Sequence, residues 1–156
     1  MGFIRALTFL TRFPIYPKFI DEHLLARSTV YFPIVGLLIG LILGYMDIIL
    51  GYLFHDAVRA IILIIAYITI TGGLHLDGLV DTFDGILGGY TKEEILEIMR
   101  DSSMGTFGGI ALIVSLMLKF ALYISFTNEI RFVALILAPS ISRWILAYGK
   151  KVIEAT

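Results

Sequence analysis

The sequence predicts an all-α fold: a multi-pass integral membrane bundle of about four transmembrane helices with additional interfacial helices. The first observation is composition, because 58% of the 156 residues are hydrophobic and 16% are charged, with a mean hydropathy of +0.92. A soluble domain is usually about 45–50% apolar and about 25% charged. The second is a set of four long apolar windows, and the third is the lack of any two-residue strand alternation. We expect residues 1–156 to form a single membrane-embedded domain.

The four apolar windows cover about residues 31–54, 57–74, 105–126 and 130–148. Each approaches the roughly 20 apolar residues that a helix needs to cross a bilayer. In the first window, Gly36, Gly40 and Gly44 recur every four residues, a spacing that lets a second helix approach closely. The alternative is that these glycines are merely tolerated in lipid.

Two shorter amphipathic segments predict interfacial helices. Residues 1–14 carry two arginines among large apolar side chains, and Pro14 and Pro17 are expected to end this helix. Residues 92–101 have an apolar stripe opposite charged positions. Thr91 and Glu94, three residues apart, fit a capping box at the start of the second helix.

Lysine and arginine in the short flanks predict the orientation of the bundle. One side holds eight basic residues: Arg5, Arg12, Lys18, Arg27, Lys92, Arg100, Lys150 and Lys151. The opposite side holds Arg59 and Arg131. We therefore expect a cell-membrane protein whose termini and residues 75–104 face the cytoplasm. The net charge of −1 argues against nucleic-acid binding, and the absence of cysteine excludes disulfides and thiol chemistry.

An acidic segment, GGLHLDGLVDTFDGILGG at residues 72–89, follows the second window directly. On a helix over residues 76–88, Asp77, Asp81 and Asp84 stand at i, i+4 and i+7, within an arc of roughly 60°. Glycines lie on or beside the same face. Like charges at this spacing repel each other, and the repulsion grows where a membrane lowers the local dielectric constant.

Either protonation or a bound cation would relieve this repulsion. Carboxylates without cysteine or clustered histidine suit hard cations, so the segment predicts ligands for Mg²⁺ above all, with Mn²⁺ and Ca²⁺ as alternatives, at Asp77, Asp81 and Asp84. One or two such ions could neutralise a pyrophosphate and stabilise a departing phosphate. Two alternatives are a solvated polar turn with incidental acids and a proton- or cation-relay site in a transporter.

A second polar cluster, RDSSMGTFGG, spans residues 100–109 at the start of the third window. Ser102, Gly105 and Thr106 predict a helix start, where backbone N–H groups can bind a phosphate. Arg100 could pair with that phosphate, and Asp101 could join the metal ligands or act as a base. The alternative is a helix stop and cap with an Arg–Asp surface pair.

Two further arginines, Arg12 and Arg143, are candidates for phosphate contact. Arg143 lies inside an apolar window, where an arginine usually faces a cavity or a partner. Snorkelling of its side chain to the membrane surface is the alternative. Four other polar residues are assigned to helix ends or helix–helix contacts: His55, Asp56, Asp47 and Lys119.

Five motifs together resemble the cobalamin synthase family, the adenosylcobinamide-GDP ribazoletransferases. They are FLTRFPI (9–15), FPIVGLLIG (32–40), GGLHLDGLVDTFDGILGG (72–89), RDSSMGTFG (100–108) and APSISR (138–143). The resemblance implies a magnesium-dependent phosphotransferase embedded in the membrane. Such an enzyme joins α-ribazole, or its 5′-phosphate, to adenosylcobinamide-GDP and releases GMP, a late step of cobalamin biosynthesis.

Together with the resemblance, the residue patterns lead to a hypothesis for the role of each candidate residue. Asp77, Asp81 and Asp84 would bind Mg²⁺. Asp84 and Asp101 would be catalytic, with Asp101 completing the metal site or accepting the proton of the ribazole 5′-hydroxyl. His75, the third catalytic candidate, would orient an aspartate or contact substrate. The phosphate-binding residues would be Arg100, Ser102, Gly105, Arg12 and Arg143.

Members of this family are generally longer, so we expect a truncated or short form, and a unit of this size could dimerise to enclose a site. Residues 81–85, DTFDG, are also similar to the D-x-x-D-G motif of CDP-alcohol phosphotransferases. ILGGY follows Gly85, however, where that family has an alanine–arginine pair. A CDP-alcohol phosphotransferase and a cation-coupled transporter therefore stand as the alternative functions.

Overall fold

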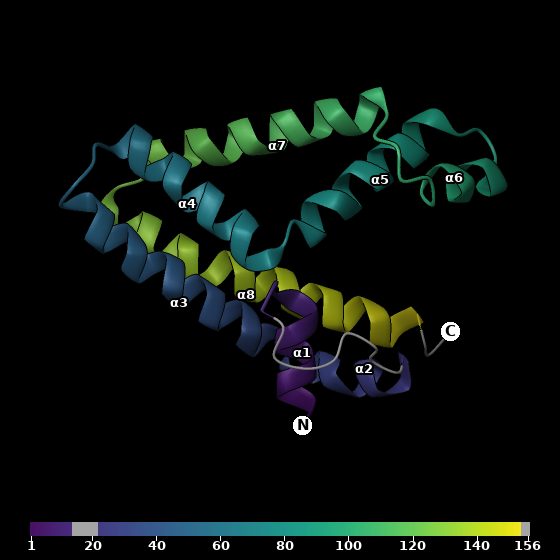
Figure 1. Cartoon of the computed structure of the whole chain (residues 1–156), viewed down its shortest axis with the longest axis horizontal. Helices are drawn as coiled ribbons and strands as arrows, with labels where there is room; N and C mark the ends of the chain where they lie inside the picture. The colour runs from purple at the N-terminus through teal and green to yellow at the C-terminus, as the bar shows by residue number, and fades with distance from the viewer. Residues whose placement is uncertain (14–21, 154–156) are drawn as a thin grey trace. The chain divides into compact units, whose positions relative to one another are not determined.

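A computed structural model describes residues 1–13 and 22–153, with side chains for residues 1–13 and 24–149, and it confirms the all-helical prediction (Figure 1). Within this part of the chain every regular element is a helix and none is a strand. The chain divides into two compact units, unit 1 (Met1–Gly72 and Tyr123–Thr156) and unit 2 (Gly73–Leu122). That residues 1–156 form one functional domain stays a prediction.

Unit 1 contains α1 (Gly2–Leu10), α2 (Glu22–Ser28), the 3-10 helix η1 (Thr29–Tyr31), α3 (Phe32–Gly51), α4 (Asp56–Thr71) and α8 (Asn128–Ile153). Unit 2 contains α5 (Leu74–Gly88) and α6 (Lys92–Ile98), and most of α7 (Thr106–Ser125). All four predicted windows are therefore helical. The sequence prediction missed α2 and η1, which precede the first window.

Among the described residues, three segments are long and apolar enough to cross a membrane alone: Leu24–Gly51, Thr106–Ser125 and Asn128–Gly149. The helix of the second window ends at Thr71 and is too short by itself, so it forms a fourth candidate only when α4 and α5 are counted together. Gly72 and Gly73 interrupt that pair with φ values of 65° and 78°. This left-handed backbone is open to glycine but strained for other residues.

The pair α3 and α8 dominates the packing of unit 1 (Figure 1). A Cβ atom added to Gly40 would lie 2.7 Å from the Cα atom of Ile136, and one added to Gly36 would lie 2.8 Å from the Cα atom of Ser140. Both neighbours are backbone atoms of α8, so no side-chain rotation could make room. The glycine stripe therefore does what its spacing predicts and lets two helices approach closely.

Helix α1 is amphipathic, as predicted, and buries Ala6 and Leu10 in the apolar core of unit 1. It ends at Leu10 instead of continuing to residue 14. The reason is local, because the backbone at Thr11 turns extended and the N–H of Arg12 donates to the carbonyl oxygen of Ile70 in α4 at 2.8 Å. Of the residues used above, Pro14, Pro17 and Lys18 lie outside the described part of the chain, as do the side chains of Lys150 and Lys151.

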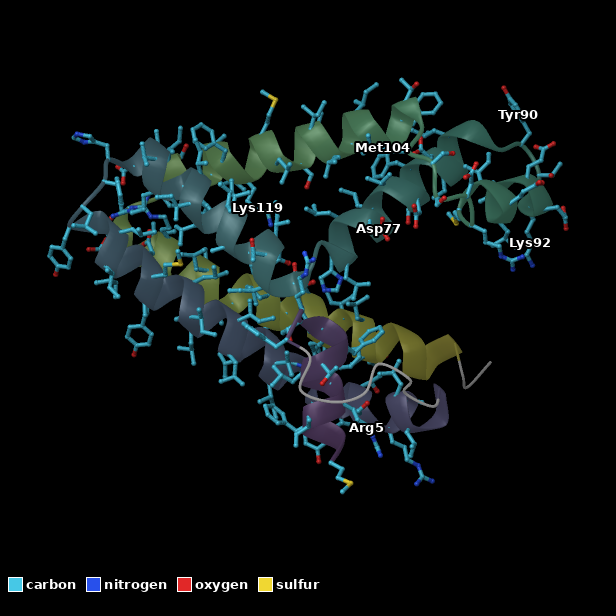
Figure 2. All side chains as sticks on the ribbon, in the orientation of Figure 1. Arg5, Asp77, Tyr90, Lys92, Met104 and Lys119 are labelled. Carbon is cyan, nitrogen blue, oxygen red and sulfur yellow. The ribbon has the colours of Figure 1, made fainter. Side chains whose placement is uncertain are left out.

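In unit 2, the predicted capping box is present at the start of α6. The hydroxyl of Thr91 accepts from the backbone N–H of Glu94 at 3.2 Å, and the Glu94 carboxylate accepts from the N–H groups of Thr91 and Tyr90. Tyr90 itself projects away from the helices (Figure 2). Helix α6 ends at Ile98, three residues earlier than predicted, and packs on α5 where Gly85 faces Met99.

Candidate functional site

Helix α5 carries the three predicted aspartates, as their spacing requires. Their surroundings differ sharply, because Asp77 is exposed, Asp81 is half-buried and Asp84 is buried, with 7% of its surface accessible. Figure 2 shows Asp77 in the first part of α5. The aspartates thus share one helix without sharing one environment.

The carboxylate of Asp84 is held by the start of α7. Its Oδ2 atom accepts from the backbone N–H of Gly105 at 2.8 Å, and its Oδ1 atom accepts from that of Gly108 at 2.8 Å. The first N–H groups of a helix have no partner inside the helix, and a negative charge is favourable there. The anion that occupies this helix start is therefore a side chain of the protein, where the sequence suggested a phosphate.

The loop between α6 and α7 presents Asp101. Its Oδ1 atom accepts from the backbone N–H of Ser103 at 3.0 Å, and this hydrogen bond lowers the pKa of the Asp101 carboxyl. A lower pKa keeps the group ionised at neutral pH and makes it a weaker general base. Both roles predicted for Asp101, metal ligand and base, stay predictions.

A cavity of about 270 Å³ opens at the junction of α5, the loop and α7. Its lining combines two carboxylates, two hydroxyls and glycine backbone with apolar edges, and it consists of Asp84, Gly88, Ile98, Asp101, Ser103, Gly105, Thr106 and Phe107. Three predicted site residues, Asp84, Asp101 and Gly105, therefore meet at one cavity. Because its lining holds two carboxylates and no basic side chain, and the N–H groups of Gly105 and Gly108 already donate to Asp84, the cavity suits a cation or a hydroxyl donor better than a bare phosphate.

The other site residues predicted in unit 2 lie outside the lining of this cavity. Asp77 and Asp81 stand earlier on α5, and His75 is half-buried in its first turn. Arg100 and Ser102 are exposed on the loop. Ser103, Phe107 and Gly108 also belong to the site and were not predicted from the sequence. The glycine pair in GTFGG is the signal that the start of α7 approaches another element closely.

The two remaining phosphate candidates belong to unit 1. Arg12 is exposed just after α1. Arg143 is fully buried, donates from Nη1 to the hydroxyl of Tyr67 at 3.0 Å and lies with its Cζ atom 5.6 Å from the centre of the Tyr67 ring. Because the guanidinium is enclosed by the helices, the snorkelling alternative is wrong for Arg143. Its contact with a phosphate stays a prediction.

Unit 1 also contains a buried charge cluster, which was not predicted from the sequence. Asp47, 2% exposed, lies 3.0 Å from Nε of Arg59 and 3.2 Å from Nε of Arg131. Both arginines also reach Asp56 at 3.1 Å and the side-chain oxygen of Asn128. Two acids and two bases balance in charge, and the cluster joins α3, α4 and α8. The signal in the sequence was an aspartate inside an apolar window, which needs a partner.

Whether the acidic face fits magnesium depends on its donors. Three carboxylates on one helix are the hard oxygen ligands that Mg²⁺ prefers, so the chemistry of the set fits. Among the described residues, however, no three acidic or histidine side chains stand close enough to form a finished metal site. Asp84 in particular already accepts two backbone hydrogen bonds.

The family model described as cobalamin-5-phosphate synthase matches residues 2–154 of the chain. The chain is 42% identical over 153 residues to the adenosylcobinamide-GDP ribazoletransferase of Fusobacterium nucleatum, covering 92% of the chain and 55% of that protein. It is 42% identical over 146 residues to the same-named protein of Roseiflexus sp., covering 92% and 54%, and 51% identical over 116 residues to that of Acetivibrio thermocellus, covering 73% and 46%. The chain spans about half the length of the curated relatives it matches. No solved structure matches it.

Proposed function

The chain belongs to the cobalamin-5-phosphate synthase family, and we propose that it serves as a magnesium-dependent adenosylcobinamide-GDP ribazoletransferase. Its substrates would be adenosylcobinamide-GDP and α-ribazole or α-ribazole 5′-phosphate. One observation supports this most directly. The acidic face of α5 and a polar cavity of about 270 Å³ occur in the same compact unit.

In the proposed reaction, a ribose hydroxyl oxygen of the ribazole acceptor, other than the 5′ oxygen that bears the phosphate in α-ribazole 5′-phosphate, forms a bond to the phosphorus that carries the corrinoid. The P–O bond of the pyrophosphate breaks, GMP leaves with the electron pair, and the hydroxyl proton passes to a base. When bound, magnesium supplies positive charge that offsets the charge of the pyrophosphate and of the departing phosphate. Catalysis of this kind depends mainly on positioning and electrostatics.

The chain's own residues take distinct parts in this proposal. Asp77 and Asp81 would hold the cation, since their carboxylates stand at successive turns of α5. Asp101 would stay ionised on the cavity wall, where its pKa is lowered by the hydrogen bond from Ser103. The exposed guanidinium of Arg100 would neutralise phosphate charge.

The proposal includes a place for the protein in the cell. The candidate spans support a multi-pass membrane protein, and the excess of basic residues in the flanks supports a cytoplasmic site in the cell membrane. A nucleotide-activated donor and a ribazole acceptor are polar molecules that would reach the site from that side.

A product assay tests the function. Protein reconstituted in vesicles should release GMP only when Mg²⁺, adenosylcobinamide-GDP and a ribazole acceptor are all present, and Asp77→Asn should abolish the release. The matched control is Glu93→Gln, which removes one exposed acid from α6 of the same unit. Release of CMP from a CDP-linked lipid would instead identify a CDP-alcohol phosphotransferase. Cation flux without a nucleotide product would identify a transporter.

A further inference from the structure

Asp84 differs from the other two aspartates in how its charge is compensated. Both of its oxygens accept backbone N–H groups, at 2.8 Å each, from residues three apart at the start of α7. Hydrogen bonds to a charged acceptor are about twice as strong as those between neutral groups. The positive end of the α7 dipole adds to this stabilisation. The buried carboxylate is therefore satisfied without a cation.

Gly105, just before α7, and Gly108, in its first turn, leave the space that this carboxylate fills. A Cβ atom added to Gly105 would overlap the Asp84 carboxylate, with its Cγ atom 2.8 Å away. A Cβ atom added to Gly108 would also overlap the carboxylate, and would lie 2.8 Å from the carbonyl oxygen of Val80. The close approach of α5 and α7 at this point thus requires both glycines. Close packing and the two hydrogen bonds together hold the start of α7 against α5.

This contact between α5 and α7 forms part of the cavity wall. Gly105, Thr106 and Phe107 line the cavity together with Asp84, so a shift of the first turn of α7 would change the cavity's shape. Coordination of a metal by Asp84 would compete with the two backbone bonds, because the same oxygens serve both. Asp77 and Asp81, which are exposed and half-buried, have no such competition from α7.

From this geometry we infer that Asp84 is a positioning residue that clamps the start of α7 onto α5 and shapes the cavity, while cation binding belongs to Asp77 and Asp81. The inference rests on the proposed function for the identity of the cation. It reassigns one member of an acidic triad whose three members the sequence predicts to be metal ligands. It also gives Gly105 and Gly108 one shared task, that of making room for the clamp.

The test compares metal binding with local order in the reconstituted chain. Mn²⁺ stands in for Mg²⁺ and is followed by electron paramagnetic resonance, while hydrogen exchange reports the amides of Gly105 and Gly108. Asp84→Asn should leave the Mn²⁺ affinity and spectrum unchanged. The same variant should speed exchange at both glycine amides by about tenfold or more, because a charge-assisted hydrogen bond is lost. Asp77→Asn should weaken Mn²⁺ binding by about tenfold or more and leave exchange at both glycine amides unchanged.

Two additions keep the result decisive if Asp84→Asn folds poorly. Gly108→Ala retains the carboxylate but displaces it, and should speed exchange at Gly105 while preserving Mn²⁺ affinity. In the GMP assay, either variant should raise KM for the GDP-activated donor and leave the Mg²⁺ concentration for half-maximal activity unchanged.

The inference is overturned if Asp84→Asn weakens Mn²⁺ binding as much as Asp77→Asn, or if exchange at the two glycines does not change. A wild-type chain that binds no Mn²⁺ would overturn the metal assignments in the proposed function and in this inference. The exchange measurements would still decide whether Asp84 clamps α7.

Discussion

Replacing Asp47 by alanine tests the importance of the buried charge cluster in unit 1. The substitution removes the carboxylate that lies 3.0 Å from Arg59 and 3.2 Å from Arg131. Both guanidinium groups are buried between the packed helices, since Arg59 is 6% exposed and Arg131 is 1% exposed. Asp56 and Asn128 remain as partners, but the buried charge is no longer balanced.

The expected cost follows from burial. Removing one partner of a buried ion pair costs about 3–5 kcal/mol, because an uncompensated charge is left behind. Asp56 supplies a matched control, since it contacts the same two arginines at 3.1 Å but its side chain is 60% exposed. An exposed pair contributes about 0–1 kcal/mol. The two alanine variants should therefore differ by several kcal/mol although they remove the same chemical group from the same cluster.

Reversible unfolding of the purified chain in mixed micelles, followed by circular dichroism, measures the difference. Asp47→Asn adds an intermediate case, because an amide keeps the shape and one acceptor while losing the charge. Equal losses for Asp47→Ala and Asp56→Ala would refute the argument, since burial would then have no part in the energetics of the cluster.

Three further outcomes are expected. Gly40→Ala should lower the free energy of unfolding by about 1–3 kcal/mol, because the new methyl group meets the α8 backbone. Gly149→Ala is the control, because that position faces open space, and it should leave the free energy of unfolding unchanged in the same assay. Arg143→Met should preserve or raise thermal stability, since it replaces a buried charge by an apolar chain of similar length. If Arg143 contacts phosphate, the same variant should lower GMP release. A stable variant with full activity would exclude that contact. A carbon-13 NMR titration should find the pKa of Asp101 below its ordinary value, because the carboxylate accepts a hydrogen bond from Ser103. Any stability gained from that hydrogen bond is present at neutral pH and is lost as acid protonates the carboxyl. An ordinary pKa would contradict the hydrogen bond.

Much of the fold is readable from the sequence because its signals are local. The apolar windows, the glycine spacing on α3 and the capping box at Thr91 each depend on residues within a few turns of one another. The errors arise from contacts between residues that are distant in the sequence. Helix α1 ends early because the N–H of Arg12 bonds to Ile70, a partner 58 positions away (70 − 12) that no short pattern reveals.

The candidate site was predictable in its chemistry and not in its contacts. The spacing of Asp77, Asp81 and Asp84 correctly indicates one helix, and it cannot distinguish a carboxylate exposed to a ligand from one buried against another helix. That distinction depends on Gly105 and Gly108, more than 20 residues along the chain. Likewise, Asp47 and Arg131 are 84 residues apart, so their pairing is set by tertiary packing.

The close packing of α3 on α8 has a consequence for the timing of assembly. Gly51 at the end of α3 and Asn128 at the start of α8 are 77 positions apart (128 − 51). At roughly 5–20 residues per second, synthesis of the intervening chain takes about 4–15 s. During that interval the glycine stripe of α3 has no α8 to cover it. The newly made α3 remains in the membrane or the insertion machinery with its glycine face unpacked. A competing helix could pack on that face before α8 is made.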